Sequence, residues 1–311
     1  MSEEEIVGLP VKELEFKEKA YRLFFLTEHL NIQEFEGGFF GIAESDEWGN
    51  IADHGAAAAI YADILCDLFE VEPEVRKRTV KAAALHDSGK VQEILAFRKK
   101  PQPTTDELKE MMEENRKRLE GLQIDPDIVS LAQASIPETE KGPTTLEEQI
   151  VWYVDAMLMK AEPVKISQRM DEAVSESLDE ARSARNRAIH ELFTYGSGGE
   201  TKNLHQVQKE IGEKLSQEFV DKLQLGIDPG NLHTYLKTVF SQRVADFDWY
   251  QALENYFTGF EKLDSLDAAA TDQQIINSRF FVEIVVLLDR YSRELLGKSV
   301  FGNLVARSKV G

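Results

Sequence analysis

The chain has 311 residues, and its 36 basic against 56 acidic side chains give a formal net charge of −20 at pH 7. Such a surface repels nucleic-acid phosphates and anionic membranes, so we expect neither long nucleic acids nor a membrane as partners. The sequence contains no apolar run of about 18 residues, and its acidic start MSEEEIVGLP lacks the apolar region of a secretory signal. Together with a single cysteine, Cys66, these features predict a cytoplasmic protein.

Helical periodicity runs through most of the chain, and no strand pattern stands out. The expected helices cover residues 11–30, 54–70, 73–88, 106–119, 125–135, 147–160, 171–194, 203–224, 231–260 and 272–296. Pro73 suits the first position of its helix, and Thr145 with Glu148 forms a capping box. We therefore predict an all-α fold, with one domain over residues 1–168 and a helical accessory domain over residues 169–311.

The segment Ala82–Lys90, AAALHDSGK, places a polar pair, His86 and Asp87, at the end of an alanine-rich helix. Thr79, Ala82 and Ala83 lie one and two turns before His86 on the same helical face, so the imidazole should point toward the interior. Buried histidine and aspartate need partners, and a divalent metal satisfies both at once. A histidine that is satisfied within the core is the alternative interpretation.

Two other helices present similar groups on their buried faces. His54 begins a helix in which Ala57, Ala58 and Tyr61 share its face. Asp155 stands in the middle of the apolar stripe of the helix at residues 147–160, where an unpaired carboxylate would cost several kcal/mol. Two imidazoles and two carboxylates suit one divalent ion, and the mixture does not choose among Mn, Fe, Co, Ni, Zn and Mg.

The order His54, His86–Asp87, Asp155 resembles the HD-domain metal-dependent phosphohydrolases, and Leu85–Lys90, LHDSGK, is close to that family's LHDxGK. The resemblance spans about residues 45–160 and implies a helical HD core. It also implies that His54, His86, Asp87 and Asp155 ligate a metal, that Asp87 orients the attacking water, and that Lys90 lies near the substrate phosphate. A lysine at a helix C-terminus is also favoured by the helix dipole alone, which is the alternative explanation for Lys90.

Members of the family with two or more metals carry further histidines between the HD pair and the last aspartate. Residues 88–154 contain no histidine, so the resemblance favours a mononuclear site over di-iron oxygenase chemistry. The function expected is cleavage of a small phosphoester, such as a nucleotide or related phosphate. The alternatives are a degenerate HD module with a regulatory or protein-interaction role and, less favoured, an HD-type metal oxygenase or lyase.

The second half of the chain carries no motif of its own. Its most apolar segment, residues 275–295, is expected to form core or a subunit interface, so a homo-oligomer through the C-terminal helices is one possible assembly.

Overall fold

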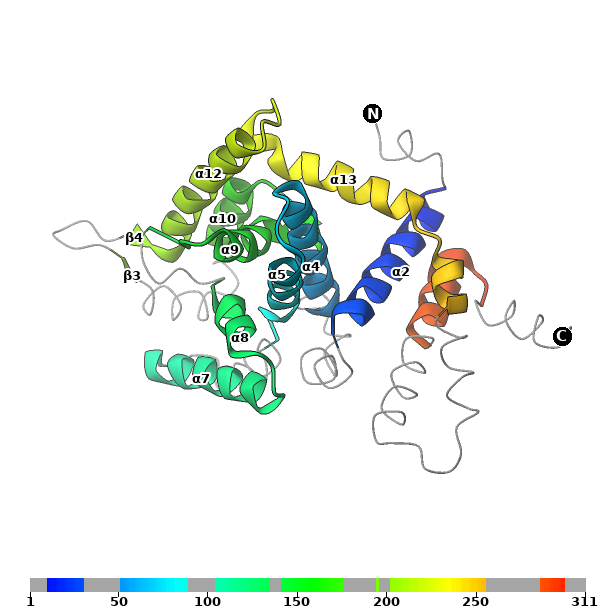
Figure 1. Ribbon diagram of the computed structural model, residues 1–311, viewed down its shortest axis with the longest axis horizontal. Coiled ribbons are helices and arrows are strands. Elements are labelled where there is room, and N and C mark those ends of the chain that lie inside the picture. The colour runs from blue at the N-terminus through cyan, green and yellow to red at the C-terminus, as the bar shows by residue number, and fades with distance from the viewer. Residues whose placement is uncertain are drawn as a thin grey trace, which may run out of the picture. The chain divides into compact units, whose positions relative to one another are not determined.

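A computed structural model of the chain describes residues 10–30, 51–88, 104–134, 141–175, 194–195, 202–255 and 286–299. The described part is mostly helical, which confirms the all-α prediction (Figure 1). The helices are α2 (Val11–His29), α4 (Ile51–Leu68), α5 (Pro73–Leu85), α7 (Thr105–Gly121), α8 (Pro126–Gln133), α9 (Leu146–Met157), α10 (Ile166–Ser175), α12 (Leu204–Lys222), the short 3-10 helix η2 (Pro229–Asn231) and α13 (Leu232–Asp246). In these ranges no helix has the length and apolar character needed to cross a membrane.

Two pairs of very short strands accompany the helices. β1 (Leu158–Met159) pairs antiparallel with β2 (Glu162–Pro163), and β3 (Thr194–Tyr195) pairs antiparallel with β4 (Lys202–Asn203). Each strand has two residues, which is too short to produce an alternating pattern in the sequence. The β1–β2 hairpin follows α9 directly.

The chain forms two compact units, one made of residues 33–238 and the other of residues 1–32 with 239–311. This grouping differs from the division at residues 168 and 169 expected from the sequence, because the second unit combines both ends of the chain. The boundary falls within α13. The functional assignment of the two expected domains rests on motifs in the sequence and remains a prediction.

The core of the larger unit is built on α4, α5 and α9, which lie side by side in Figure 1. Alanines Ala56–Ala59 and Ala82–Ala84 are almost completely buried, and their small side chains let α4 and α5 pack closely. α9 adds the larger buried side chains Trp152 and Tyr153. α10 packs against α12, where a Cβ on Gly212 would come within 2.6 Å of the Ile166 side chain, so glycine permits the close approach.

The smaller unit is held by aromatic contacts. Tyr21 meets Phe247 edge to face with ring centroids 5.1 Å apart, and Phe16 meets Trp249 in the same way at 5.0 Å. Lys17 donates a hydrogen bond to the carbonyl of Ala245 at 2.8 Å. Residues 286–296 are also helical.

Local signals in the sequence set several helix ends. Pro73 lies in the first turn of α5, and the capping box of Thr145 and Glu148 at the start of α9 is confirmed. The continuous helix expected over residues 231–260 is wrong. α13 ends at Asp246 and a new helix covers residues 249–255, because the Asp248 carboxylate accepts hydrogen bonds from two backbone N–H groups and starts a helix there.

Candidate metal centre

His54 lies in the first turn of α4, and its side chain is 11% exposed. Its Nδ1 contacts the carbonyl oxygen of Lys160, which stands in the two-residue turn between β1 and β2. Lys160 has a φ of +60°, a left-handed conformation that costs a non-glycine residue about 1 kcal/mol. The hairpin therefore aims a backbone carbonyl at the His54 ring.

His86 follows the last residue of α5 and occupies the C-cap position, with a side chain that is only 1% exposed. Its Nδ1 lies 2.7 Å from the carbonyl oxygen of Ala83. The helix end thus fixes the ring through its own last turn.

The two carbonyl contacts determine which nitrogen of each ring carries a proton. A carbonyl only accepts, so the Nδ1–H of each histidine must donate, and in the neutral rings both Nε2 atoms keep a lone pair. These Nε2 atoms face each other at 3.2 Å. Two lone pairs at that separation require a proton or a cation between them. Histidines that ligate metals are characteristically oriented by a hydrogen bond from their other nitrogen.

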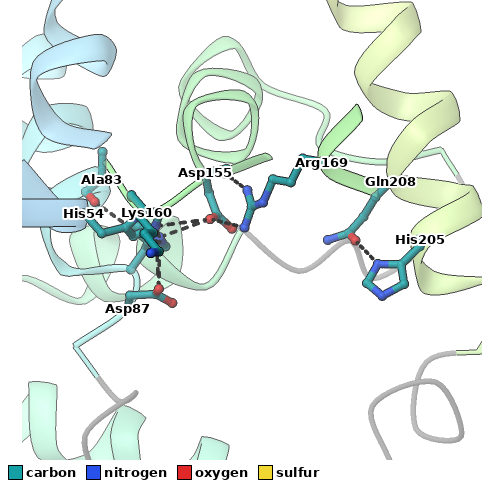
Figure 2. A network of polar contacts seen from close by, with 9 residues as sticks. His54, Ala83, Asp87, Asp155, Lys160, Arg169, His205 and Gln208 are labelled. Atoms are coloured by element: carbon teal, nitrogen blue, oxygen red, sulfur yellow. Dashed lines mark hydrogen bonds and ion pairs between the residues drawn. The ribbon is translucent and has the colours of Figure 1, made fainter. Parts of the chain in front are cut away.

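Two carboxylates complete the group. Asp155 Oδ1 of α9 lies 3.5 Å from His54 Nε2 and 3.4 Å from His86 Nε2. Asp87 Oδ2 lies 3.6 Å from the first of these nitrogens and 3.8 Å from the second. Figure 2 shows the side chains of His54, Asp87 and Asp155 directed toward one another. All four residues predicted from the sequence to be ligands therefore converge.

The separations fit donors around one ion. Ligand atoms about 2.0 to 2.2 Å from a common metal are about 2.8 to 3.1 Å apart at octahedral right angles and about 3.3 to 3.6 Å apart in a tetrahedron. Four of the five distances above lie between 3.2 and 3.6 Å, and the fifth, from His86 Nε2 to Asp87 Oδ2, is 3.8 Å. The donor atoms of His54, His86 and Asp87 all lie within 4.8 Å of one another. Asp155 is not part of this mutually close trio and approaches it only at the two histidine nitrogens. Nitrogen and carboxylate donors in this mixture suit first-row divalent metals.

The electrostatics also favour a cation. Burial lowers the pKa of the His86 imidazole, but the carboxylates of Asp87 and Asp155 outweigh burial and raise this pKa from 6.5 to about 9. Burial opposes ionisation of Asp155, yet the charges of His86 and Arg169 hold the pKa of its carboxyl well below 3.8. The Asp155 carboxylate is therefore ionised at physiological pH.

Arg169 of α10 is a site residue that the sequence did not indicate. It donates hydrogen bonds to the backbone carbonyl of Asp155 and, at 3.5 Å, to Oδ1 of the same residue (Figure 2). The guanidinium thus holds both the backbone and the carboxylate of Asp155. A single arginine on an amphipathic helix carries no spacing signal toward a residue 14 positions earlier, and the same holds for the carbonyl of Lys160.

The turn that carries Asp87 is anchored by α7. Arg118 donates a hydrogen bond of 2.6 Å to the carbonyl of Ser88, whose side chain is fully buried. Asp87 itself is 21% exposed, more than the other three residues of the group. Lys90, the predicted phosphate-binding residue, lies outside the described residues.

No protein-family model matches this chain, and neither the curated proteins nor the solved structures include a significant match to it.

Proposed function

We propose that the chain is a metal-dependent phosphohydrolase of the HD type that cleaves a small phosphoester. The observation that carries this proposal is the convergence of four donor atoms from three separate helical segments, with two imidazole lone pairs facing each other at 3.2 Å. A buried arrangement of this kind is costly without a cation, and the carbonyls behind both histidines hold it in place.

The proposal gives each residue a role that follows from its position in the site. His54, His86, Asp87 and Asp155 would hold one divalent ion, which supplies a Lewis acid for the phosphoryl group and lowers the pKa of water toward neutrality. Asp87, as the most exposed of the four, accepts a hydrogen bond from the attacking water and orients it. Arg169 keeps the Asp155 carboxylate ionised and in position.

The net charge of the protein favours a small substrate over a large one. A net charge of −20 disfavours a long polyanion, whereas a small phosphoester needs only local positive charge to bind. Arg169, whose side chain is 27% exposed, and Lys90, three residues after Asp87, are the cations that the proposal assigns to this role. Lys90 would stabilise the charge that develops on the transferring phosphoryl group.

The test is phosphate release from a panel of nucleoside monophosphates, sugar phosphates and other small phosphoesters, after the protein is stripped of metal and reloaded with each candidate ion. We expect turnover with at least one ion and none after chelation. Metal binding without hydrolysis of any phosphoester would instead support the degenerate-module alternative.

Two variants separate the assigned roles. Asp87→Ala should lose both metal and turnover, because it removes a ligand and the water-orienting carboxylate together. Lys90→Ala should keep its metal and lose about 2 to 4 kcal/mol of transition-state stabilisation, by analogy with the removal of an oxyanion donor. His29→Ala, a change in the smaller unit, is the matched control and should retain both. Full activity in the Lys90 variant would make this lysine an ordinary cation at a helix end.

A further inference from the structure

A second site is suggested by a cavity of about 230 Å³ in the larger unit, where the start of α10 faces α12 and η2. None of the four residues of the metal centre lines it. Its volume equals roughly eight water molecules at about 30 Å³ each, below the range of about 300 to 1,000 Å³ typical of pockets for drug-sized ligands. The cavity therefore suits a compact ligand.

One wall of the cavity presents positive charge and hydrogen-bond donors. Lys165 lines it and forms no ion pair with any acidic residue of the described ranges. Ile166 and Ser167 begin α10, and the N–H groups of a first helical turn have no acceptor within the helix. A Cβ on Gly230 would lie 2.9 Å from Asp228 Oδ1 and 3.3 Å from Lys165 Nζ, so the glycine leaves the space beside both groups open.

The lining also includes carboxylates. Glu213 of α12 lines the cavity, and within the described part of the chain it has no basic partner. Asp228 lines it as well, with Oδ1 already accepting the N–H of Gly230 at 2.8 Å. Lys165 and Glu213 do not pair with each other, so both charges are available to a ligand.

The lining carries charges of both signs, because Lys165 and the positive end of α10 occur in it together with Glu213 and Asp228. His233 adds no charge at neutral pH, since burial and the Lys165 charge lower the pKa of its imidazole. An anion would be repelled by both carboxylates and by the net charge of −20, and a cation by Lys165 and the helix start. A neutral molecule with separated charges meets neither barrier.

We propose that this cavity binds a small zwitterion of the free α-amino acid class, with its carboxylate at Lys165 and the start of α10 and its ammonium group at Glu213. Val164, Ile166 and Pro229 also line the cavity and give the ligand's side chain an apolar surface. At the buried end, the Tyr153 hydroxyl lies 3.1 Å from Ser216 Oγ, which donates to the carbonyl of Gly212.

The experiment measures thermal unfolding of the full chain with each free α-amino acid at about 10 mM, a concentration at which ligands with a Kd below about 1 mM raise the Tm measurably. We expect at least one amino acid to stabilise the protein. Its methyl ester, which lacks the carboxylate, and its N-acetyl derivative, which lacks the ammonium group, should each bind about tenfold more weakly or worse.

Two variants assign the ligand's ends. Lys165→Met should no longer distinguish the acid from its methyl ester, and Glu213→Gln should no longer distinguish the free amine from its N-acetyl form. Both side chains are exposed, so the substitutions should not affect folding. Lys214→Met, an exposed lysine on the same α12 that does not line the cavity, is the control and should bind as the unchanged protein does. The proposal is overturned if no amino acid raises the Tm, or if both variants discriminate as before.

Discussion

The two ends of the α4–α5 pair bury acidic groups in opposite ways. At one end, Arg76 at the start of α5 meets Asp63 through two hydrogen bonds of 2.6 and 2.8 Å and also bonds Asp67 at 2.8 Å. At the other end, His54 and His86 bring two lone pairs together beside Asp87 and Asp155.

The difference lies in what neutralises the acids. A guanidinium occupies the Asp63 cluster with matched bidentate geometry, so that cluster is complete and its role is structural. The histidine cluster holds two carboxylates, and the Nδ1–H donors of its rings are already used by backbone carbonyls, so in the neutral rings the Nε2 atoms can only accept. We call the Asp63 end of the α4–α5 pair the closed end, because Arg76 already neutralises its acidic groups. The His54 and His86 end is open, because it can still bind a cation.

The largest expected effect comes from removing a ligand. Asp155→Ala should weaken binding of the divalent ion on the order of 1,000-fold, more than the roughly 10- to 100-fold caused by loss of an outer hydrogen bond. Metal affinity can be measured by competition with a chelator. Asp63→Asn is the matched control at the closed end and should bind the ion normally. Equal affinities for the two variants would remove the contrast between the clusters.

The free energy of unfolding of the metal-free protein should decrease as the pH rises. The His86 pKa is about 9 in the folded chain against 6.5 for the free group, so its protonation stabilises the fold fully below pH 6.5. That contribution falls as the pH rises toward 9, by up to about 3 kcal/mol. Urea unfolding of the stripped protein across this range measures it, with His86→Gln expected to flatten the curve. A flat curve for the unchanged protein would contradict the cation requirement.

At the closed end, Asp63→Asn should lower the free energy of unfolding by about 2 to 3 kcal/mol. The loss stays below the cost of breaking a fully buried pair, because the Arg76 side chain is 31% exposed and keeps Asp67. Denaturant unfolding of the metal-free protein gives the value. A loss of metal with unchanged stability would mean that the roles of the two ends are reversed.

Arg169→Ala should reduce metal affinity about 10- to 100-fold, since it frees the Asp155 carboxylate that the guanidinium orients. Arg169→Lys should recover part of the affinity by restoring the charge without the second hydrogen bond. The absorption spectrum of the Co²⁺ form reports whether the ligand geometry has changed. Unaltered affinity and spectrum in the alanine variant would limit Arg169 to a surface role.

The smallest effect is expected at Lys160. Lys160→Gly keeps the carbonyl that orients His54 and relieves the left-handed backbone, so stability should rise by about 1 kcal/mol with metal binding intact. Lys160→Val should destabilise the protein, because a β-branched residue is strained at a φ of +60°. Thermal unfolding of the two variants gives the comparison.

Sequence patterns indicated site residues where a polar side chain stands among apolar neighbours. His54, His86 and Asp155 each stand on an apolar helical face, and that conflict identified them before their distances were known. Arg169 and the Lys160 carbonyl conflict with nothing locally, so only the tertiary structure associates them with the site. The Asp63–Arg76 cluster likewise carried no signal, since charged residues near helix ends are ordinary.

For the fold, too, sequence patterns were informative only where the signal is local. Helix starts with local signals, such as Pro73 and the Thr145 capping box, were predicted, because the physics acts within a few residues. The break between α13 and residues 249–255 was missed, since helical periodicity continues across Asp248 and only its cap marks the new start. The pairing of α2 with residues from the far end of the chain depends on long-range aromatic contacts that no local pattern encodes.

Elemental analysis of the full chain, after stripping and reconstitution with each candidate metal, measures whether His54, His86, Asp87 and Asp155 bind a divalent ion. We expect about one tightly held ion per chain for the unchanged protein and none for the double variant His54→Ala, His86→Ala. The metal-site proposal needs both results. It is contradicted if no metal binds to the unchanged chain, or if the double variant retains the same ion at the same stoichiometry.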